Sequence, residues 1–370
     1  MANRGESLTH IALKKLRQNP LAMAAFLLIA LAAFVSVFAY ILATDKTKNS
    51  ALQQVALKYK PIGYEQLMLK VPLEGYTSQL NFTDYFLGKI QDFEEIAITE
   101  FKFTGNEIVY QPYIGDGMHA DPKSLALSHW TKEGIDATEI EKNYVYTKKF
   151  LLGTDSFGRD FYSRLLLGTR ISFFVGFIAV AISLIVGITI GALGGYYRGK
   201  LDNFIMWLIN VVWSIPTLLL VIAITLAIGK GFWQIFIAVG LTMWVEVARV
   251  VRGQFLSFRE MEFVEAAKAL GMSDLRIIFK QILPNILAPV IVISAANFAA
   301  AILIESGLSF LGIGAQPPTP SWGNIIKEHY AHIILGKQHL AILPGVLILL
   351  LVLAFNIFGN QLRDAMDIKN

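Results

Sequence analysis

The chain has 370 residues, 55% of them hydrophobic, and a formal net charge of +4. Long unbroken apolar runs exclude an ordinary soluble domain, and the modest positive charge is more typical of membrane-protein loops than of a nucleic-acid-binding surface. The absence of cysteine excludes disulfides and thiolate metal sites.

The first long apolar run covers residues 21–43 and follows Lys14, Lys15 and Arg17. It is too long for the apolar part of a signal peptide, and no small-residue cleavage site follows it. We therefore predict a retained transmembrane helix at 21–43, after a cytoplasmic N-terminal segment at 1–20.

The next segment, residues 44–150, alternates apolar and polar residues, for example at 96–103 and 107–110. The turn signals Gly105-Asn106 and Gly115-Asp116-Gly117 lie between or after these stretches. Because a structureless loop of this length is uncommon, we predict an extracytoplasmic insertion that is partly β and contains a hairpin.

Five further apolar runs approach the length of about 20 residues that a transmembrane helix needs. They cover residues 171–196, 204–228, 233–250, 285–306 and 340–362. With the first run they predict an all-α polytopic membrane protein of six transmembrane helices, in which residues 151–370 form one membrane domain.

Basic residues concentrate in the loops after the second and fourth predicted spans and at the C-terminus, which is typical of the cytoplasmic side of a membrane. Arg159, Arg164 and Arg170 fall on the opposite side. We interpret these three residues as part of a polar helix that lies at the membrane interface.

Small residues at Gly187, Gly191, Gly194 and Gly195 give the second predicted span a face for close approach by another helix. Packing within the chain and dimerisation both explain such a face, and we favour packing within the chain. Residues 194–201 imitate a phosphate loop, but Leu201 stands where that motif needs Ser or Thr, and a transmembrane helix precedes it instead of a strand. We predict no bound nucleotide and no other cofactor.

No residues occur at a catalytic spacing, so we predict that the chain is not an enzyme. Its six histidines are scattered along the sequence. We interpret His329 and His332 as solvated residues of an outer loop rather than as metal ligands.

Polar residues in the predicted spans are candidates for a translocation path, because such groups usually face a bundle interior or a water-filled cavity. We assign this role to Glu305 and Asn297 on the fifth predicted span. For Glu246 and Arg249, near the end of the fourth, contact with water or with each other at the interface is at least as good an explanation.

The loop at 257–284 predicts a polar helix–turn–helix between two apolar spans. Helix-forming residues continue through 257–270, and Gly271 suits a left-handed stop. Ser273 suits the cap of a second helix, with Asp274 in its first turn, and Pro284 ends or kinks that helix.

This loop also presents groups suited to contact with a soluble partner. Ala266 and Ala267 are too small to anchor in lipid headgroups, but they allow close approach of another protein surface. Glu265 can pair with a cationic group there, or with Lys268 on its own helix.

At these residues the chain resembles the integral-membrane permeases of binding-protein-dependent ABC importers. The pattern Glu-Ala-Ala-x-x-x-Gly at 265–271, followed by Ile-Leu-Pro at 282–284, is similar to the coupling loop of that family. Stretches 152–165, 309–314, 316–324 and 353–365 more narrowly resemble the second permease subunit of dipeptide and oligopeptide importers. Gln281 stands where the family often has His, and segment 44–150 is longer than the family pattern.

The resemblance implies a permease subunit of the bacterial inner membrane that forms the path for dipeptides or oligopeptides in an ATP-driven importer. The implied partners are a second permease subunit, two ATPase subunits, an extracytoplasmic peptide-binding protein and membrane lipid, but no nucleic acid. Coupling to the ATPase subunits is then expected at Glu265, Ala266, Ala267, Gly271, Ser273, Asp274 and Pro284.

An ion-driven secondary transporter is the alternative function. Transporters of that class commonly contain internal repeats and carry functional charges near the middle of the membrane. Neither feature is apparent in this sequence.

Overall fold

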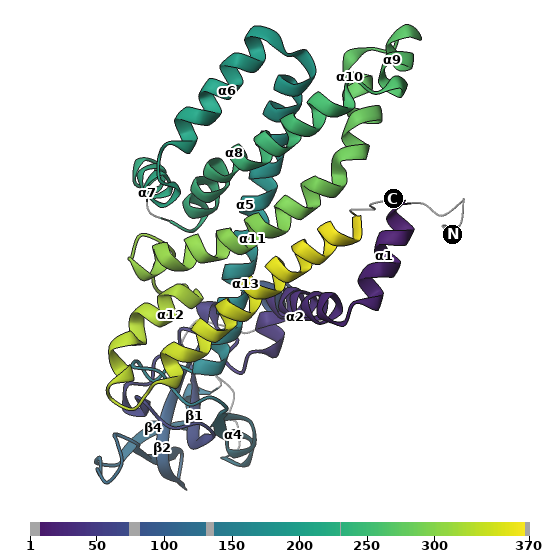
Figure 1. Ribbon diagram of the computed structural model, residues 1–370. Coiled ribbons are helices and arrows are strands. Elements are labelled where there is room, and N and C mark those ends of the chain that lie inside the picture. The colour runs from purple at the N-terminus through teal and green to yellow at the C-terminus, as the bar shows by residue number, and fades with distance from the viewer. Residues whose placement is uncertain (1–7, 74–81, 131–136, 230, 367–370) are drawn as a thin grey trace.

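The computed structural model describes residues 8–73, 82–130, 137–229 and 231–366. Helices form an elongated bundle, and a small β-sheet lies at one end of it (Figure 1). This arrangement confirms the predicted fold class. The bundle helices are α1 (Leu8–Gln18), α2 (Pro20–Leu42), α5 (Phe161–Tyr197), α6 (Gly199–Trp213), α7 (Thr217–Ile228), α8 (Phe232–Phe258), α9 (Glu262–Ala269), α10 (Asp274–Ile277), α11 (Leu287–Phe310), α12 (Trp322–His329) and α13 (His339–Met366).

Five helical segments among the described residues are long and apolar enough to cross a membrane. They are α2, α5, α8, the stretch from α10 through α11, and α13. The pair α6 and α7 counts as a sixth only if its two helices, which meet at 91°, form one broken span. The single helix predicted at 204–228 is therefore wrong, because Pro216 lacks an N–H and disfavours a helical Ile215.

The longest of these helices, α5, packs along α8 through glycine. A Cβ atom added to Gly187 would lie 2.5 Å from the Cβ of Val247, and one added to Gly191 would lie 2.5 Å from the carbonyl oxygen of Ala248. Gly195 meets Phe255 in the same way one turn later. The close-approach face therefore packs within the chain, as expected.

Aromatic residues fill the centre of the bundle where α5, α11, α12 and α13 meet. The rings of Phe298 and Phe355 stack with centroids 4.0 Å apart. Trp322 is buried beside them, and its indole N–H donates to the carbonyl of Leu165, 3.2 Å away. This cluster ties the last helix of the chain to the first turns of α5.

The sheet has five antiparallel strands in the order β4-β3-β2-β1-β5. The strands are β1 (Tyr64–Pro72), β2 (Phe93–Thr104), β3 (Glu107–Pro112), β4 (Lys123–Ala126) and β5 (Val145–Phe150). Strands β2 and β3 form the expected hairpin, in which Thr104 pairs with Glu107 across a turn whose first residue, Gly105, has φ +58°.

Short helices surround the sheet, and one of them completes its core. They are α3 (Asp84–Leu87), α4 (Ala137–Tyr144) and the 3₁₀ turns η1 (Lys48–Ser50), η2 (Val55–Leu57) and η3 (Leu127–His129). Ile140 of α4 is fully buried with Ile98, Ile108 and Trp130. The sheet unit thus has a hydrophobic cluster of its own.

Buried ion pairs join the loop after β5 to helices α5 and α12. Asp155 pairs with Arg159 at 2.5 Å, and Glu328 of α12 accepts from Arg159 at 2.6 Å and from Arg164 at 3.3 Å. Both guanidinium groups are almost fully buried. The expectation of a polar interfacial helix is therefore wrong here, because these arginines satisfy two carboxylates inside the protein.

Candidate functional site

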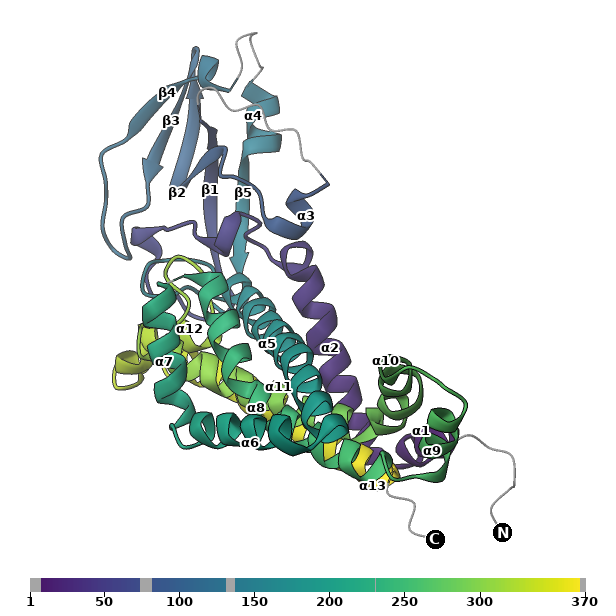
Figure 2. The ribbon, with the colours of Figure 1, turned by 90° about the horizontal axis from the view of Figure 1, so that it is seen from above.

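Two short helices project from the end of the bundle that is remote from the sheet (Figures 1 and 2). We call α9, α10 and their connecting turn, residues 262–277, the foot. The predicted helix at 257–270 is broken, since α8 ends at Phe258 and α9 begins at Glu262. At the break Glu260 pairs with Arg198 at 2.5 Å, and the Arg259 guanidinium donates to the carbonyl of Tyr196. These contacts override local helix propensity.

The turn of the foot depends on Gly271. Its φ is +75°, and its N–H donates to the carbonyl of Lys268 at 2.9 Å. The N–H of Met272 donates to the carbonyl of Ala267 at 3.1 Å, which completes a Schellman motif. The predicted left-handed stop is confirmed.

The second helix of the foot is attached to the end of α5. Ser273 occupies the N-cap position with an extended backbone, but its side chain makes no capping hydrogen bond. Asp274 instead accepts a hydrogen bond from the hydroxyl of Tyr196 at 2.7 Å. Tyr196 is a site residue that the sequence did not reveal, because no local pattern links it to a residue 78 positions away.

One face of the foot packs against the bundle. Val264 and Ala267 are buried with Ile277, Ile278 and Phe255 in a continuous hydrophobic cluster. The candidates Glu265 and Ala266 lie on the exposed face. Glu265 makes no ion pair with any described residue, so the proposed pair with Lys268 is not formed.

Apolar side chains are also exposed around the foot. Leu270 is 82% exposed, Leu275 64% and Phe279 60%, and Met261 and Phe263 are exposed beside them. We call these five residues the foot surface. Sequence reasoning missed them, although apolar residues on both sides of a predicted glycine turn in a polar loop were a usable signal.

The foot continues into α11 through two irregular helical segments. A π-helical segment, η4 (Ile278–Ile282), is followed by a 3₁₀ segment, η5 (Leu283–Ile286). Pro284 lies in the first turn of η5, where its missing N–H is tolerated. It therefore accompanies a change of helical pitch and does not end the helix.

The two path candidates on α11 lie inside the chain. Glu305 is fully buried, and it accepts hydrogen bonds from the hydroxyls of Ser309 at 2.7 Å and Ser172 of α5 at 3.2 Å. Asn297 is 1% exposed, and its Nδ2 has no hydrogen-bond partner among the described residues. Their role in a path stays a prediction.

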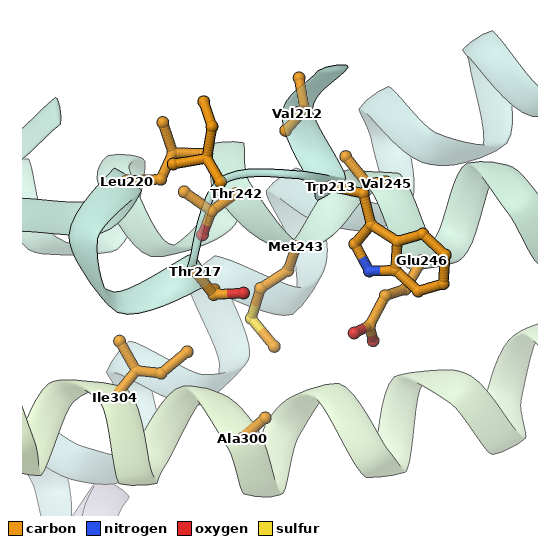
Figure 3. Close-up of a pocket in the computed structure, with 11 residues that line it drawn as sticks. Val212, Trp213, Thr217, Leu220, Thr242, Met243, Val245, Glu246, Ala300 and Ile304 are labelled. Carbon is orange, nitrogen blue, oxygen red and sulfur yellow. The ribbon is translucent and has the colours of Figure 1, made fainter. Parts of the chain in front are cut away.

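A pocket of about 150 Å³ lies where the bend between α6 and α7 meets α8 and α11 (Figure 3). Thr217, Met243 and Glu246 line it. Glu246 is exposed and makes no ion pair among the described residues. Arg249, one turn along α8, stacks its guanidinium 3.6 Å from the ring centroid of Trp213. Glu246 and Arg249 therefore do not pair.

One group of side chains has the composition of a metal site. The ligand atoms of Asp155, Glu328 and His329 lie within 4.8 Å of one another. Arg159 and Arg164 already pair with both carboxylates, so a cation there would meet two positive charges.

The two outer-loop histidines differ in their surroundings. His329 is fully buried, so the interpretation of a solvated His329 is wrong. Burial lowers the pKa of its imidazole, and its Nδ1 lies 2.8 Å from the carbonyl of Ile325. His332 lies in η6 (Tyr330–Ile333) and is half-buried, and its Nε2 is 2.6 Å from the hydroxyl of Tyr59.

Comparisons with known proteins agree with this architecture. Residues 187–369 match the family described as binding-protein-dependent transport system inner membrane component. Residues 7–61 match the N-terminal TM domain of oligopeptide transport permease C. The unmatched interval, 62–186, contains all five strands.

Several relatives are similar over more than half of the chain. The glutathione transport system permease protein GsiD of Pectobacterium atrosepticum is 40% identical over 218 residues, which are 59% of this chain and 72% of that protein. The dipeptide transport system permease protein DppC of Alkalihalophilus pseudofirmus is 43% identical over 217 residues, 59% of this chain and 71% of the relative.

Among solved structures, an inward-facing MetNI methionine ABC transporter has a TM-score of 0.46 and 18% identity, over 55% of this chain and 95% of that one. From the extent and identity of the sequence matches, this chain belongs to the family of binding-protein-dependent transport system inner membrane components.

Proposed function

We propose that the chain is the path-forming permease subunit of an ATP-driven importer of dipeptides or oligopeptides, and that the foot couples it to ATPase subunits. Membership of the permease family supports the role in transport. The names of the relatives, a dipeptide permease and a glutathione permease, support a peptide cargo, because glutathione is itself a small peptide. A second permease and an extracytoplasmic peptide-binding protein complete the proposed importer.

The foot surface is the observation that carries the coupling proposal. Contiguous exposed apolar side chains mark interaction sites on proteins. Those of the foot surface lie on α9, on α10 and on the residues that adjoin these two short helices, which project beyond the bundle (Figure 2). A soluble subunit that covers Leu270, Leu275 and Phe279 would remove them from water.

The attachment of the foot supports a mechanical role. Val264 and Ala267 pack into the bundle, and Tyr196 fixes Asp274 to the end of α5. Movement of an ATPase subunit against the foot would therefore pass to α8 and α11 as a rigid-body displacement. The irregular segments η4 and η5 are the natural place for α11 to adjust, since π-helical turns often occur at functional sites.

Affinity purification in mild detergent tests this proposal. We expect the chain to copurify with an ATPase, and we expect Gly271→Leu or Glu265→Lys to abolish ATP-driven peptide uptake while the variant chain remains inserted. Normal uptake by both variants would refute the role of the foot. Peptide transport by the purified chain alone in lipid vesicles would refute the importer and favour an ion-driven transporter.

We propose that the foot faces the cytoplasm and the sheet faces outward, an orientation supported by the basic residues at the foot end. The chain has no cysteine, so a single introduced thiol reports one position. In intact spheroplasts an impermeant reagent should label His119→Cys, in an exposed loop of the sheet unit, but not Ala269→Cys on α9. The reverse labelling would contradict the orientation.

Glu305 and Asn297 stay our candidates for the translocation path, but both are buried, so cargo could contact them only after a movement of the helices. Since Ser172 of α5 holds Glu305, cargo would reach this carboxylate only if α11 moves away from α5. Glu246 is the exposed alternative. Peptide uptake by Glu305→Gln and Glu246→Gln separates the two, because loss in only one variant identifies the carboxylate that transport needs.

A further inference from the structure

A groove lies between α1 and α2, where the N-terminal helix turns into the first span. Its volume is about 740 Å³, and the residues that line it include Leu13, Lys14, Arg17, Met23, Phe26 and Phe358. None of these residues belongs to the foot or the path. We propose that this groove binds one anionic phospholipid, with the phosphate on Lys14 and Arg17 and an acyl chain along the aromatic floor.

The rim of the groove is basic. Lys14 and Arg17 are three residues apart and therefore share one face of α1. Both are exposed, and α1 contains no Asp or Glu among its residues LTHIALKKLRQ. Neither residue pairs with a described carboxylate. Two unneutralised cations on one helix face suit a phosphate group.

The floor of the groove is apolar. The rings of Phe26 and Phe358 lie with centroids 5.9 Å apart, which joins α2 to α13. Phe26 is 47% exposed and Leu13 60%. An acyl chain would cover this surface, so the groove pairs an apolar floor with a cationic rim, as a phospholipid requires.

The bend that forms the groove is built into the fold. Asn19 caps α2 by accepting from the N–H groups of Leu21 and Ala22, at 3.0 and 3.2 Å. Its amide also donates to Gln361 of α13. Leu16 is buried against Ala22, Leu362 and Ala365. The groove is therefore preformed, and a ligand does not have to order α1.

Its position matches a membrane surface. Helix α2 is a candidate span whose far end leads to the sheet, so α1 lies at the opposite end of that span (Figure 2). A basic helix next to the end of a transmembrane helix is attracted to anionic lipid headgroups.

The chain provides a matched control. Lys15 is on the same helix, but it lines a different hollow with Asp364 and Gln361. The double variant Lys14→Ala/Arg17→Ala removes the proposed site, and Lys15→Ala removes one equivalent charge beside it. Lys14→Arg/Arg17→Lys keeps both charges and serves as the rescue variant.

Native mass spectrometry of the detergent-purified complex, given mixed phosphatidylglycerol and phosphatidylcholine, measures the retained lipid. At about 5.4-fold per basic residue, the double variant should hold phosphatidylglycerol about 30-fold more weakly. Lys15→Ala and the rescue variant should bind as wild type does, and inorganic phosphate should not displace the lipid.

Four results would overturn the proposal. They are equal retention of the two lipids by wild type, undiminished binding in the double variant, an equal loss in Lys15→Ala, and displacement by phosphate alone. A helix of another subunit in the groove would appear as the first result. Size-exclusion elution of the double variant with its partner subunits shows that it is folded.

Discussion

Replacement of Leu270 by Ala tests the foot surface most directly. Leu270 is 82% exposed, so truncation removes little contact within the chain and should change its own stability by no more than about 0.5 kcal/mol. In a docked complex the same truncation removes about three buried carbon groups, worth about 2.4 kcal/mol at full burial. Scaled by the 82% that is free to be buried, the loss is about 2 kcal/mol, or about 30-fold in the dissociation constant.

The assay is titration of the purified ATPase against the permease in nanodiscs, with binding measured at equilibrium. Leu335→Ala is the control, because Leu335 is also a leucine, is 68% exposed and lies in the loop between η6 and α13, outside the foot. We expect Leu270→Ala to bind about 30-fold more weakly and Leu335→Ala to bind as wild type does. Equal affinities for the two variants would show that the ATPase does not cover the foot surface.

Three further predictions concern the framework around the site. Gly191→Ala should lower the free energy of unfolding by about 1–3 kcal/mol, because the added methyl group would overpack against Ala248. Gly253→Ala has open space at its Cβ and should be neutral or stabilising. A similar change in melting temperature for both variants would contradict the packing argument. Tyr196→Phe should lower the free energy of unfolding by about 1 kcal/mol and speed amide hydrogen exchange in α10, because it removes the hydrogen bond to Asp274. Unchanged exchange would show that this hydrogen bond does not hold the foot to α5. Because burial lowers the pKa of His329, the neutral imidazole contributes fully to stability above pH 6.5, and this contribution is lost as the pH falls below that value. The melting temperature of His329→Gln should therefore depend less on pH between 7.5 and 5.5 than that of the wild type. An equal pH dependence in the two proteins would exclude His329 as its source.

Local rules were enough for the parts of the fold that local chemistry decides. Gly271 adopts the left-handed conformation in the turn of the foot, and Gly105 adopts it at the start of the β2–β3 turn. Glycine takes this conformation at little cost, so both turns could be read from the sequence. Apolar run length located five of the six spans, because the need to satisfy backbone groups in lipid leaves a helix as the main solution, but it did not reveal the bend between α6 and α7.

Contacts between distant residues decided what the sequence could not. Arg159 and Arg164 are buried because Glu328 comes back to them from α12, more than 160 residues later. The break after Phe258 and the attachment of Asp274 both depend on the end of α5. Surface patterns likewise did not distinguish a buried His329 from the half-buried His332.

The 37 residues of α5 correspond to about 55 Å of helix, well beyond the roughly 30 Å of a hydrocarbon core. One end of this rod carries Arg164 in the ion-pair cluster beside the sheet, and the other carries Tyr196 against the foot. A tilt of about 5° would displace one tip by about 5 Å relative to the other. A single continuous helix therefore links the sheet end of the bundle to the foot end, so a contact that restrains one end of α5 also limits the tilt of the other.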